Sequence, residues 1–251
     1  MVQLSFAALT AIVGVLSHTA LAAPSDKRAA SCSFPNPSAS SDVVLKAAQT
    51  VTASSPFDGK NLRYSRGVKC GGQKEGGTKD AVFILESGAT ISNVVIGANQ
   101  NEGIHCQGPC TIRNVWFEDV CEDAITIRQS SGTSTITGGG AKNAADKVVQ
   151  HNGGGLVKID SYCVQDFGKL YRSCGNCGTQ VKREVQISNV IARNGKLLAG
   201  VNSNYKDVAT IDTKSNSYTS VTSICDTFEG NNKGDEPKTL TKNQSNANCK
   251  F

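Results

Sequence analysis

Apolar residues in this chain recur with one short period and one long period. Within segments such as 112–117 and 125–127, apolar and polar positions alternate, which is the pattern of strands with one buried face. From Ala81 onward, such segments follow one another with Gly, Asn or Ser between them. Each segment carries an isoleucine, at positions 91, 112, 136, 159, 187 and 211, so the spacings are 21, 24, 23, 28 and 24 residues by subtraction. A period in the low twenties, with hardly any helical pattern, predicts an all-β solenoid of stacked coils.

The composition of the repeat distinguishes this solenoid from a leucine-rich repeat, which has a similar period. The L-x-x-L-x-L frame is absent, and isoleucine and valine dominate the apolar positions. Three segments share an I-x-N-V core, with asparagines at 93, 114 and 189. Asparagine tolerates the left-handed backbone of a tight corner, and stacked amides can hydrogen-bond from coil to coil. We therefore expect an asparagine ladder in one turn of the solenoid, with three unrelated turn asparagines as the alternative.

The beginning of the chain does not follow the repeat. An apolar run from Leu4 to Leu21 closes on an A-x-A cleavage pattern, so we expect residues 1–22 to be a signal peptide. A membrane anchor is disfavoured because polar residues interrupt the run and no stop-transfer pattern follows it. Residues 23–28 end in a dibasic pair and are expected to form a short propeptide.

The remaining residues, 29–251, are expected to form one domain, because nothing between the first and the ninth cysteine resembles a linker. Its polar tail, 226–251, contains the glycosylation sequon Asn243-Gln244-Ser245. All 10 cysteines lie in this domain, and their even number fits an oxidised, extracellular framework. Zinc is the competing interpretation of the C-x-x-x-C and C-x-x-C spacings, but only two histidines follow the signal peptide. We expect disulfides, with their connectivity left open, in a secreted protein.

The formal net charge is +5. A basic secreted protein can concentrate polyanions, and nucleic acid, heparin-like glycans and acidic plant polysaccharides are all admissible partners. A solvated, mildly basic surface explains the charge equally well.

Charged residues repeat with the long period of the isoleucines. Glu102 is followed by Glu122 and Asp123 at 20 and 21 residues, then by Lys147 at 24 from Asp123 and Arg172 at 25 from Lys147, by subtraction. Residues one period apart stack in a solenoid, so we expect three carboxylates and two cations on one face. The carboxylates suit Ca²⁺, and solvated acids are the alternative. A calcium ion there would neutralise a bound uronate carboxylate and acidify the proton α to it, while a neighbouring Lys or Arg took that proton.

Two further segments contain candidate site residues. In the turn 150–155, glycines permit close approach of the backbone to another coil or to a ligand. His151 is a candidate base, but a structural or substrate-contacting role is favoured because no nucleophile lies beside it; we take His151 and Asn152 as substrate-binding candidates. The segment 166–177 places Lys169 and Arg172 next to two cysteines, and disulfides there would fix the positions of the cationic side chains.

The segments EDVCEDAITI, DKVVQHNGGG and DFGKLYRSCGNC together resemble the small secreted pectate lyases of polysaccharide lyase family three, especially the fungal ones. The resemblance covers the chain from Cys32 to Cys225. It implies a right-handed parallel β-helix and calcium-dependent β-elimination of polygalacturonate, which leaves a 4,5-unsaturated uronosyl end.

Applied position by position, the resemblance implies roles for the same residues that the spacing of the charges indicates. It implies that Glu102, Glu122 and Asp123 bind calcium, that Lys147 and Arg172 are the catalytic cations, and that Lys169 contacts substrate. The first acidic position is often Asp in the family, so Glu102 adds a methylene, and an upstream acid, Glu75 or Asp80, is a further candidate ligand. We take Arg172 as the base by analogy with other β-helical lyases, with Lys147 stabilising the enolate-like intermediate; the reverse assignment stays open.

Two other functions fit the same architecture. In a polygalacturonase, Glu122 and Asp123 would act as acid and base across the glycosidic bond, but adjacent residues on a strand point to opposite faces. A noncatalytic pectin-binding protein is disfavoured by the two cations. We therefore expect a secreted monomeric lyase that binds polygalacturonate and neither nucleic acid nor a membrane.

Overall fold

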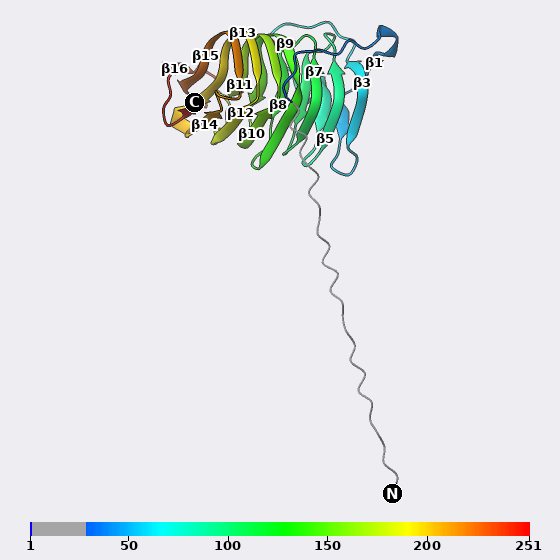
Figure 1. The fold of residues 1–251 in the computed structure, drawn as a ribbon, viewed down its shortest axis with the longest axis horizontal. Coiled ribbons are helices and arrows are strands. Elements are labelled where there is room, and N and C mark those ends of the chain that lie inside the picture. Colours follow the sequence, from blue (N-terminus) through cyan, green and yellow to red (C-terminus); the bar gives the residue numbers. More distant parts are fainter. Residues whose placement is uncertain (2–28) are drawn as a thin grey trace.

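The computed structural model describes Met1 and residues 29–251, so the expected signal peptide (1–22) and propeptide (23–28) lie, Met1 apart, outside the described residues. The described part is built of strands, joined by turns and three short 3₁₀ helices (Figure 1). The 3₁₀ helices are η1 (Ala39–Ser41), η2 (Thr78–Asp80) and η3 (Ser203–Tyr205). The strands are β1 (Val43–Val44), β2 (Gln49–Val51), β3 (Phe57–Ser65), β4 (Ala81–Leu85), β5 (Thr90–Ile96), β6 (Glu102–Cys106), β7 (Thr111–Phe117), β8 (Asp123–Ile127), β9 (Thr133–His151), β10 (Gly155–Asp160), β11 (Cys163–Ser173), β12 (Arg183–Ser188), β13 (Ile191–Asn202), β14 (Val208–Ile211), β15 (Ser217–Glu229), β16 (Lys238–Lys242) and β17 (Cys249–Lys250).

The strands stack in parallel into three sheets that wrap around one core. Sheet 1 contains the first parts of β3, β5, β7 and β9, followed by β10, β12, β14 and β17. Sheet 2 contains β1, the later parts of β3, β5 and β7, the middle of β9, and the first parts of β11, β13 and β15. Sheet 3 contains β2, β4, β6 and β8, the last parts of β9, β11, β13 and β15, and finally the antiparallel strand β16. The predicted parallel β-helix is confirmed.

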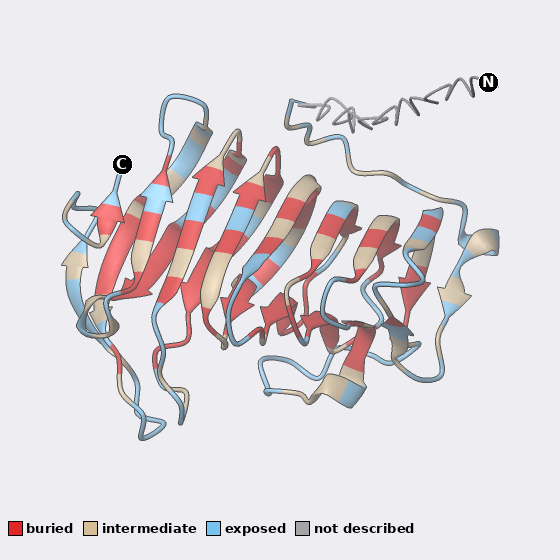
Figure 2. Cartoon of the chain, turned by 90° about the horizontal axis from the view of Figure 1, so that it is seen from below, coloured by how far each residue is buried: buried red, intermediate tan, exposed pale blue. Residues whose placement is uncertain are grey.

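The isoleucine repeat forms a continuous ladder inside sheet 1. Each isoleucine is the direct register partner of the next, in the order Ile91, Ile112, Ile136, Ile159, Ile187 and Ile211. All six are buried, and buried residues recur at matching levels of successive strands (Figure 2). Burying each isoleucine contributes about 1.5–3 kcal/mol of hydrophobic free energy, so the ladder fixes the coil register.

The expected asparagine ladder forms over part of its length. Asn93 and Asn114 have φ values of 54° and 50°, and Asn114 Nδ2 donates to Asn93 Oδ1 at 2.8 Å and to Asn61 Oδ1 at 3.3 Å. Asn189 has the same left-handed backbone, with φ 53°, but its amide donates to Asp160 Oδ1 at 2.7 Å. The ladder prediction is therefore confirmed for two of the three asparagines and wrong for Asn189, because two coils without asparagine at this turn separate it from Asn114.

The ten cysteines form five disulfides, which confirms the expected oxidised framework. The pairs are Cys32–Cys163, Cys70–Cys121, Cys106–Cys110, Cys174–Cys177 and Cys225–Cys249. The last pair anchors the C-terminal tail, whose strand β17 joins sheet 1 beside β14. The tail thereby covers strand edges at the end of the solenoid that would otherwise be open to pairing.

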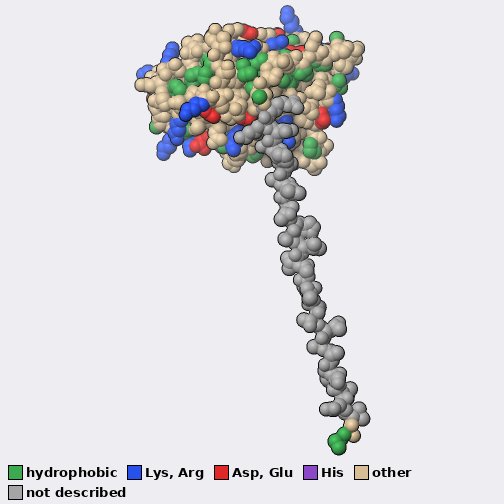
Figure 3. Space-filling view, viewed as in Figure 1, with side chains coloured by type: hydrophobic (Ala, Val, Ile, Leu, Met, Phe, Trp, Pro, Cys, Tyr) green, Lys and Arg blue, Asp and Glu red, His purple; other side chains and the backbone are tan. Residues whose placement is uncertain are grey.

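The face of the molecule shown in Figure 3 carries its charges in dispersed positions. Lysine and arginine side chains occur at several separate places on the face shown in Figure 3, with apolar and other side chains between them. Among the residues described, no helix has the length and apolar character needed to span a bilayer.

Candidate active site

Sheet 3 brings the predicted charged residues together. Asp123 is the register partner of Lys147, and Lys147 is the partner of Lys169. Ile104 pairs with Ile125, so Glu102 and Asp123, each two residues earlier, lie on neighbouring coils. The prediction that Arg172 stacks directly on Lys147 is wrong by three residues, because Arg172 pairs with Gln150. Both cations nevertheless belong to the same sheet.

A β-bulge accounts for one of these three residues, and the other two arise because the coil offset before the bulge is 23 residues (Phe167 pairs with Ala144), shorter than the 25-residue step from Lys147 to Arg172. Ala144 pairs with Phe167 and Lys147 pairs with Lys169, so residues 145 and 146 face the single residue Gly168. An extra residue in a strand bends it locally and redirects a side chain. Only glycine fits opposite this bulge, because a Cβ on Gly168 would lie 2.4 Å from the carbonyl oxygen of Asp146.

Three carboxylates form a compact acidic cluster. One oxygen from each of Glu75, Glu122 and Asp123 lies within 4.8 Å of the others. Glu122 is in the turn just before β8 and Asp123 begins the strand, so both can face the same side although they are adjacent. Glu122 Oε2 and both carboxylate oxygens of Asp123 are buried without a hydrogen bond. Burial, together with the nearby carboxylates of Glu122 and Glu102, raises the pKa of Asp123 well above its ordinary value.

Glu102 lies beside this cluster but is held by other partners. Its Oε1 accepts a hydrogen bond from the backbone N–H of Gly76 at 2.8 Å, and its Oε2 contacts His105 Nε2 at 3.0 Å. Its charge is close enough to raise the pKa of Glu75, after the larger contributions of burial and Glu122. Of the two upstream candidates, Glu75 joins the cluster, whereas Asp80 accepts a hydrogen bond from the backbone of Gly77.

Two lysines and one aspartate continue the site along sheet 3. Asp146 bridges the lysines, with Oδ2 2.5 Å from Lys147 Nζ and Oδ1 2.5 Å from Lys169 Nζ. Lys147 Nζ also lies 3.5 Å from Glu122 and 3.5 Å from Asp123. Although burial opposes its charge, the surrounding carboxylates of Asp123 and Asp146 raise the pKa of Lys147 above its ordinary value. Lys147 is therefore a firmly protonated cation, whereas Lys169 is more exposed.

Arg172 is a buried guanidinium at the edge of the same region. Its Nη1 donates to Ser173 O at 2.6 Å and to Asn202 Oδ1 at 3.0 Å, and its guanidinium carbon lies 4.0 Å from the centroid of the Phe228 ring. Among the described residues, these are the only hydrogen bonds of the guanidinium, so Nη2 has no acceptor. Burial lowers the pKa of Arg172 to about 10.

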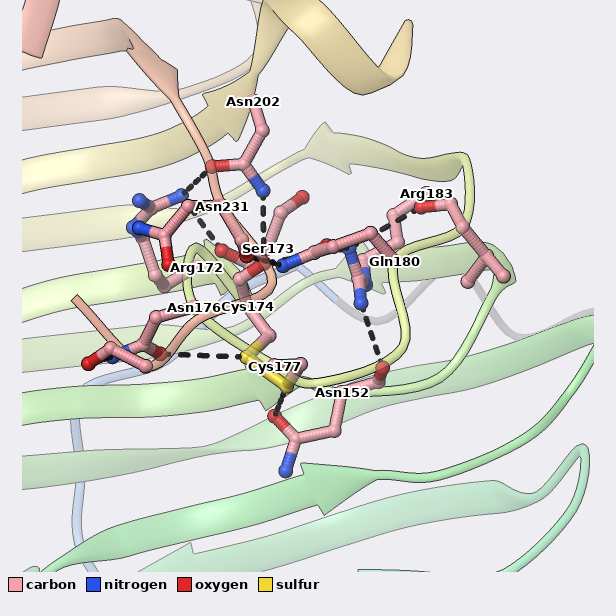
Figure 4. Close-up of a disulfide and its surroundings, with 12 residues drawn as sticks. Asn152, Arg172, Ser173, Cys174, Asn176, Cys177, Gln180, Arg183, Asn202 and Asn231 are labelled. Atoms are coloured by element: carbon pink, nitrogen blue, oxygen red, sulfur yellow. Dashed lines mark hydrogen bonds between the residues drawn. A yellow bond between two sulfur atoms is a disulfide. The ribbon is translucent and has the colours of Figure 1, made fainter. Parts of the chain in front are cut away.

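The Cys174–Cys177 disulfide helps to hold Arg172 in position through Asn202 (Figure 4). Asn202 accepts from Arg172 through Oδ1, and its Nδ2 donates to Cys174 O at 3.0 Å. Asn202 is thus fixed between the guanidinium and the disulfide-closed turn. The prediction that disulfides near Arg172 restrain it agrees with this arrangement.

The cations and acids line one open cleft of about 240 Å³, which we call the catalytic cleft. Its lining residues include Glu75, Asp146, Lys147, Lys169, Arg172 and Phe228. The cleft therefore presents one acidic end at the carboxylate cluster and three cations beside it. Sequence reasoning missed Asp146, whose only signal was its position next to Lys147, and Phe228, which lies in the final long strand.

The two remaining candidates lie away from this cleft. The imidazole of His151 is fully buried, with Nδ1 2.8 Å from the Tyr171 hydroxyl and Nε2 3.2 Å from Gly154 O. Burial lowers the pKa of His151 to about 3, so the ring is neutral and inside the core. Asn152 Oδ1 lies 3.6 Å from Cys177 Sγ, and Asn152 O accepts from Arg183 Nη2 at 2.8 Å. Both residues support the turn below the disulfide, and we leave them out of the substrate contacts proposed below.

Comparison with known proteins agrees with this geometry. The chain matches the family model "Pectate lyase" over residues 32–235. It is 56% identical over 237 residues to a probable pectate lyase E of Neosartorya fischeri, which covers 94% of this chain and 88% of the relative. It is 54% identical over 228 residues to pectate lyase E of Emericella nidulans, covering 90% of this chain and 86% of the relative.

Solved structures show the same fold. The catalytic domain of pectate lyase PelI from Erwinia chrysanthemi superposes with a TM-score of 0.69 at 31% identity, covering 81% of this chain and 94% of that domain. PelI in complex with tetragalacturonic acid superposes with a TM-score of 0.68 at 30% identity, covering 85% of this chain and 68% of that chain. The architecture, the sequence match and the relatives lead to one conclusion: this chain belongs to the pectate lyase family.

Proposed function

We propose that this protein is a secreted, calcium-dependent lyase that cleaves de-esterified polygalacturonate by β-elimination and leaves 4,5-unsaturated oligogalacturonides. The observation that carries the proposal is the pairing of two features in one cleft. Glu122 and Asp123, which have buried carboxylate oxygens without hydrogen bonds, contact Lys147, and Lys147 lines the cleft together with Lys169 and Arg172. Such an arrangement suits a hard cation and an anionic sugar at neighbouring positions.

The acidic cluster fits Ca²⁺ by the chemistry of its donors. Glu75, Glu122 and Asp123 offer only oxygen ligands, three of which are buried and unsatisfied, and Glu102 adds a fourth carboxylate beside them. Calcium takes such oxygen ligands from flexible sites. When bound, the ion would neutralise a uronate carboxylate and acidify the proton on the adjacent carbon.

The two lysines bind and orient the acidic substrate. The side chain of Lys169 is 32% exposed, so its ammonium can reach a uronate carboxylate in the cleft. The raised pKa of Lys147 keeps it protonated, and it therefore stabilises the negative charge that develops on the substrate as its proton leaves. A permanently charged lysine is a poor base, which favours Arg172 for that role.

Arg172 takes the proton from the carbon next to the carboxylate. Its Nη1 is fixed by Ser173 and Asn202, whereas its Nη2 has no hydrogen-bond acceptor within residues 29–251. The pKa of about 10, lowered by burial, gives a small unprotonated fraction in alkaline solution. The electron pair of the broken C–H bond forms the C4–C5 double bond, the C4–O bond breaks, and the departing oxygen is protonated from solvent.

A hydrolase is less compatible with the geometry. Glycosidases place their two carboxyl groups about 5–5.5 Å apart when they retain configuration and about 6.5–9.5 Å apart when they invert it. One oxygen of Glu122 lies within 4.8 Å of one oxygen of Asp123, which is closer than either of these separations. Close carboxylates of this kind favour a shared cation over acid and base catalysis.

The proposed setting follows from the covalent framework. Five disulfides in 251 residues are typical of an oxidising, extracellular compartment, which supports secretion. The proposed partner is polygalacturonate, bound by a monomer.

Product chemistry tests the proposal. The purified protein is incubated with polygalacturonate, with Ca²⁺ or with a chelator, and both ultraviolet absorbance of unsaturated ends and reducing sugar are followed. We expect absorbance and reducing ends to rise together with Ca²⁺, and both to stop with chelator. Reducing ends without absorbance would identify a hydrolase, and no product across a range of pH would leave a pectin-binding protein.

A further inference from the structure

Asp207 is a buried carboxylate that the elimination described above does not use. It lies just after η3, and its two oxygens accept three hydrogen bonds. Oδ1 accepts from Arg183 N at 2.8 Å, and Oδ2 accepts from Asn202 N at 3.0 Å and from Asn202 Nδ2 at 3.2 Å. Burial raises the pKa of Asp207, and the hydrogen bonds from Arg183 and Asn202 oppose this rise. In the alkaline range where Arg172 can lose a proton, Asp207 is therefore an anion.

This carboxylate determines which way the amide of Asn202 faces. A carboxylate only accepts hydrogen bonds, so the side of the amide that faces Asp207 has to be its NH₂ group. The same NH₂ group donates to a second acceptor, Cys174 O, at 3.0 Å. The amide oxygen is thereby directed to Arg172, whose Nη1 donates to it at 3.0 Å (Figure 4). A reversed amide would place two donors against each other at Arg172 and two acceptors against each other at Asp207.

The acceptors on Nη1 select the nitrogen from which Arg172 loses its proton. Ser173 O at 2.6 Å and Asn202 Oδ1 both require hydrogens on Nη1. Nη2 has no hydrogen-bond acceptor within residues 29–251, and a Cβ on Gly175, which lines the catalytic cleft, would lie 2.5 Å from it. Loss of a proton to alkaline solvent therefore leaves the lone pair on Nη2, beside the cleft, where it can take the proton from the substrate.

The charge of Asp207 also acts on Arg172. Burial, the largest contribution, lowers the pKa of Arg172 to about 10. The charged and titratable groups that act on the guanidinium come from β11, from β12, from the segment after η3 and from the segment before β16: Tyr171, Arg183, Asp207 and Glu236. Asp207 raises the pKa most among them, so removal of its charge lowers the pH at which Arg172 becomes a base.

We infer that Asp207 is a positioning residue for the base: through Asn202 it holds the Arg172 guanidinium so that the unprotonated nitrogen faces the catalytic cleft. This inference rests on the proposed function, in which Arg172 takes the proton from the substrate. Asp207 is not one of the residues that line the cleft, so it acts through Asn202. In the structural alternative, Asp207 only holds its loop and the tail, since its backbone oxygen accepts from Asn248 Nδ2 at 2.7 Å.

The pH profile of kcat/KM on polygalacturonate separates these two roles. Wild type and Asp207→Asn are assayed by unsaturated-product absorbance at saturating Ca²⁺. A carboxamide has one acceptor oxygen where the carboxylate has two, so the Asn202 amide is no longer fixed, and we expect the limiting kcat to fall about tenfold with KM within about twofold of wild type. Loss of the negative charge should move the plateau from about pH 10 to about pH 9. The two profiles should then nearly coincide at about pH 8 and differ about eightfold at about pH 10.5.

Three variants control for structure and for charge. Asn204→Ala removes the bonds of 2.8 Å and 2.9 Å between the Asn204 amide and Gly230, which tie the same loop to the tail without any charge, and its plateau should stay at about pH 10. Asp212→Asn neutralises an exposed acid after β14 and should leave the wild-type profile. Asp207→Glu keeps the charge, so its plateau should stay at about pH 10 even where the added methylene lowers the rate.

An equal loss at both pH values in Asp207→Asn, with the plateau still at about pH 10, would overturn the inference. Should circular dichroism show that Asp207→Asn does not fold, Asn202→Ala decides, because it removes the oxygen bonded to Arg172 and leaves Asp207 bonded to Arg183. We expect the same convergence at low pH in Asn202→Ala, and an unshifted plateau would contradict the inference. Failure of the proposed function itself would be recognised separately, because wild-type enzyme would then release no unsaturated product.

Discussion

Calcium should stabilise the folded protein through the acidic cluster, and Asp123→Asn should remove most of that effect. Without a cation, the charges of Glu75, Glu122 and Asp123 repel one another. Two unit charges 4.8 Å apart interact by about 3.5 kcal/mol at an effective dielectric constant of 20. The ammonium of Lys147 lies 3.5 Å from Glu122 and 3.5 Å from Asp123. Its attraction to each carboxylate is about 4.7 kcal/mol at the same dielectric constant. Repulsion and attraction nearly cancel, so the cost of desolvating the buried carboxylates stays uncompensated until a cation binds.

The expected stabilisation follows from binding linkage. At a calcium concentration about 100 times the Kd, a ligand that binds only the folded state adds about 2.7 kcal/mol. For a domain of this size, about 1 kcal/mol corresponds to roughly 2–4 °C in Tm, so the wild type should gain roughly 5–11 °C. Asp123→Asn removes a buried ligand and should reduce the gain to about 2 °C or less.

Differential scanning calorimetry with Ca²⁺ and with chelator measures both values. The matched control is Asp119→Asn, an exposed acid four residues before Asp123 that lies outside the cluster, and its calcium-dependent shift should equal that of the wild type. A wild-type Tm that does not change with calcium, or a calcium-dependent Tm shift in Asp123→Asn as large as that of the wild type, would refute the assignment of the cluster as the cation site.

Three further results are expected. If Arg172 is the base, log kcat/KM should rise by about one unit per pH unit and level off near pH 10, because protonated Arg172 is inactive; a flat profile would exclude it. His151 is neutral in the folded protein, where its pKa is about 3, and its pKa is about 6.5 in the unfolded chain. Its contribution to the free energy of unfolding is therefore complete well above pH 6.5 and falls by about 1.4 kcal/mol per pH unit below it. Urea unfolding at pH 6.5 and 4.5 should show a fall about 2.3 kcal/mol larger in the wild type than in His151→Gln, and equal falls would contradict the burial of a neutral ring. Asp146→Asn should lower kcat roughly tenfold, because Lys147 and Lys169 lose their common anchor, whereas Glu236→Gln in the same cleft should stay near wild type; equal effects would mean that Asp146 acts only through charge.

The fold was predictable because its determinants are local and periodic. The six isoleucines of the ladder, from Ile91 to Ile211, occupy the same place in their coils, so the repeat could be recognised directly from their spacing. Asn93 and Asn114 formed the expected ladder for the same reason. Asn189 did not, since ladder bonds need asparagine on adjacent coils, and a shared sequence motif does not show which coils are adjacent.

The site was predictable in its residue types and less so in its geometry. Asp123, Lys147 and Lys169 lie one coil apart, but Arg172 is three residues from its expected partner, because the coil is shorter than the 25-residue step from Lys147 and the bulge opposite Gly168 shifts the register by one more residue. Glu75 lies in a glycine-rich loop without periodicity, so only tertiary contacts could place it in the acidic cluster. The burial of His151 was equally invisible, because a histidine beside glycines has the same sequence signature in a core as in a binding site.

The alanine variant of Arg172 shows whether this residue performs the elimination in the catalytic cleft. Initial rates of unsaturated-product formation from polygalacturonate are measured at saturating Ca²⁺ for wild type, Arg172→Ala and the control Arg193→Ala, an exposed arginine on β13 outside the cleft. Circular dichroism and a calcium-dependent Tm verify that each variant is folded. We expect loss of product formation in Arg172→Ala with an intact calcium response, and a wild-type rate in Arg193→Ala. A folded Arg172→Ala enzyme that still releases unsaturated product at the wild-type rate would contradict this role of Arg172.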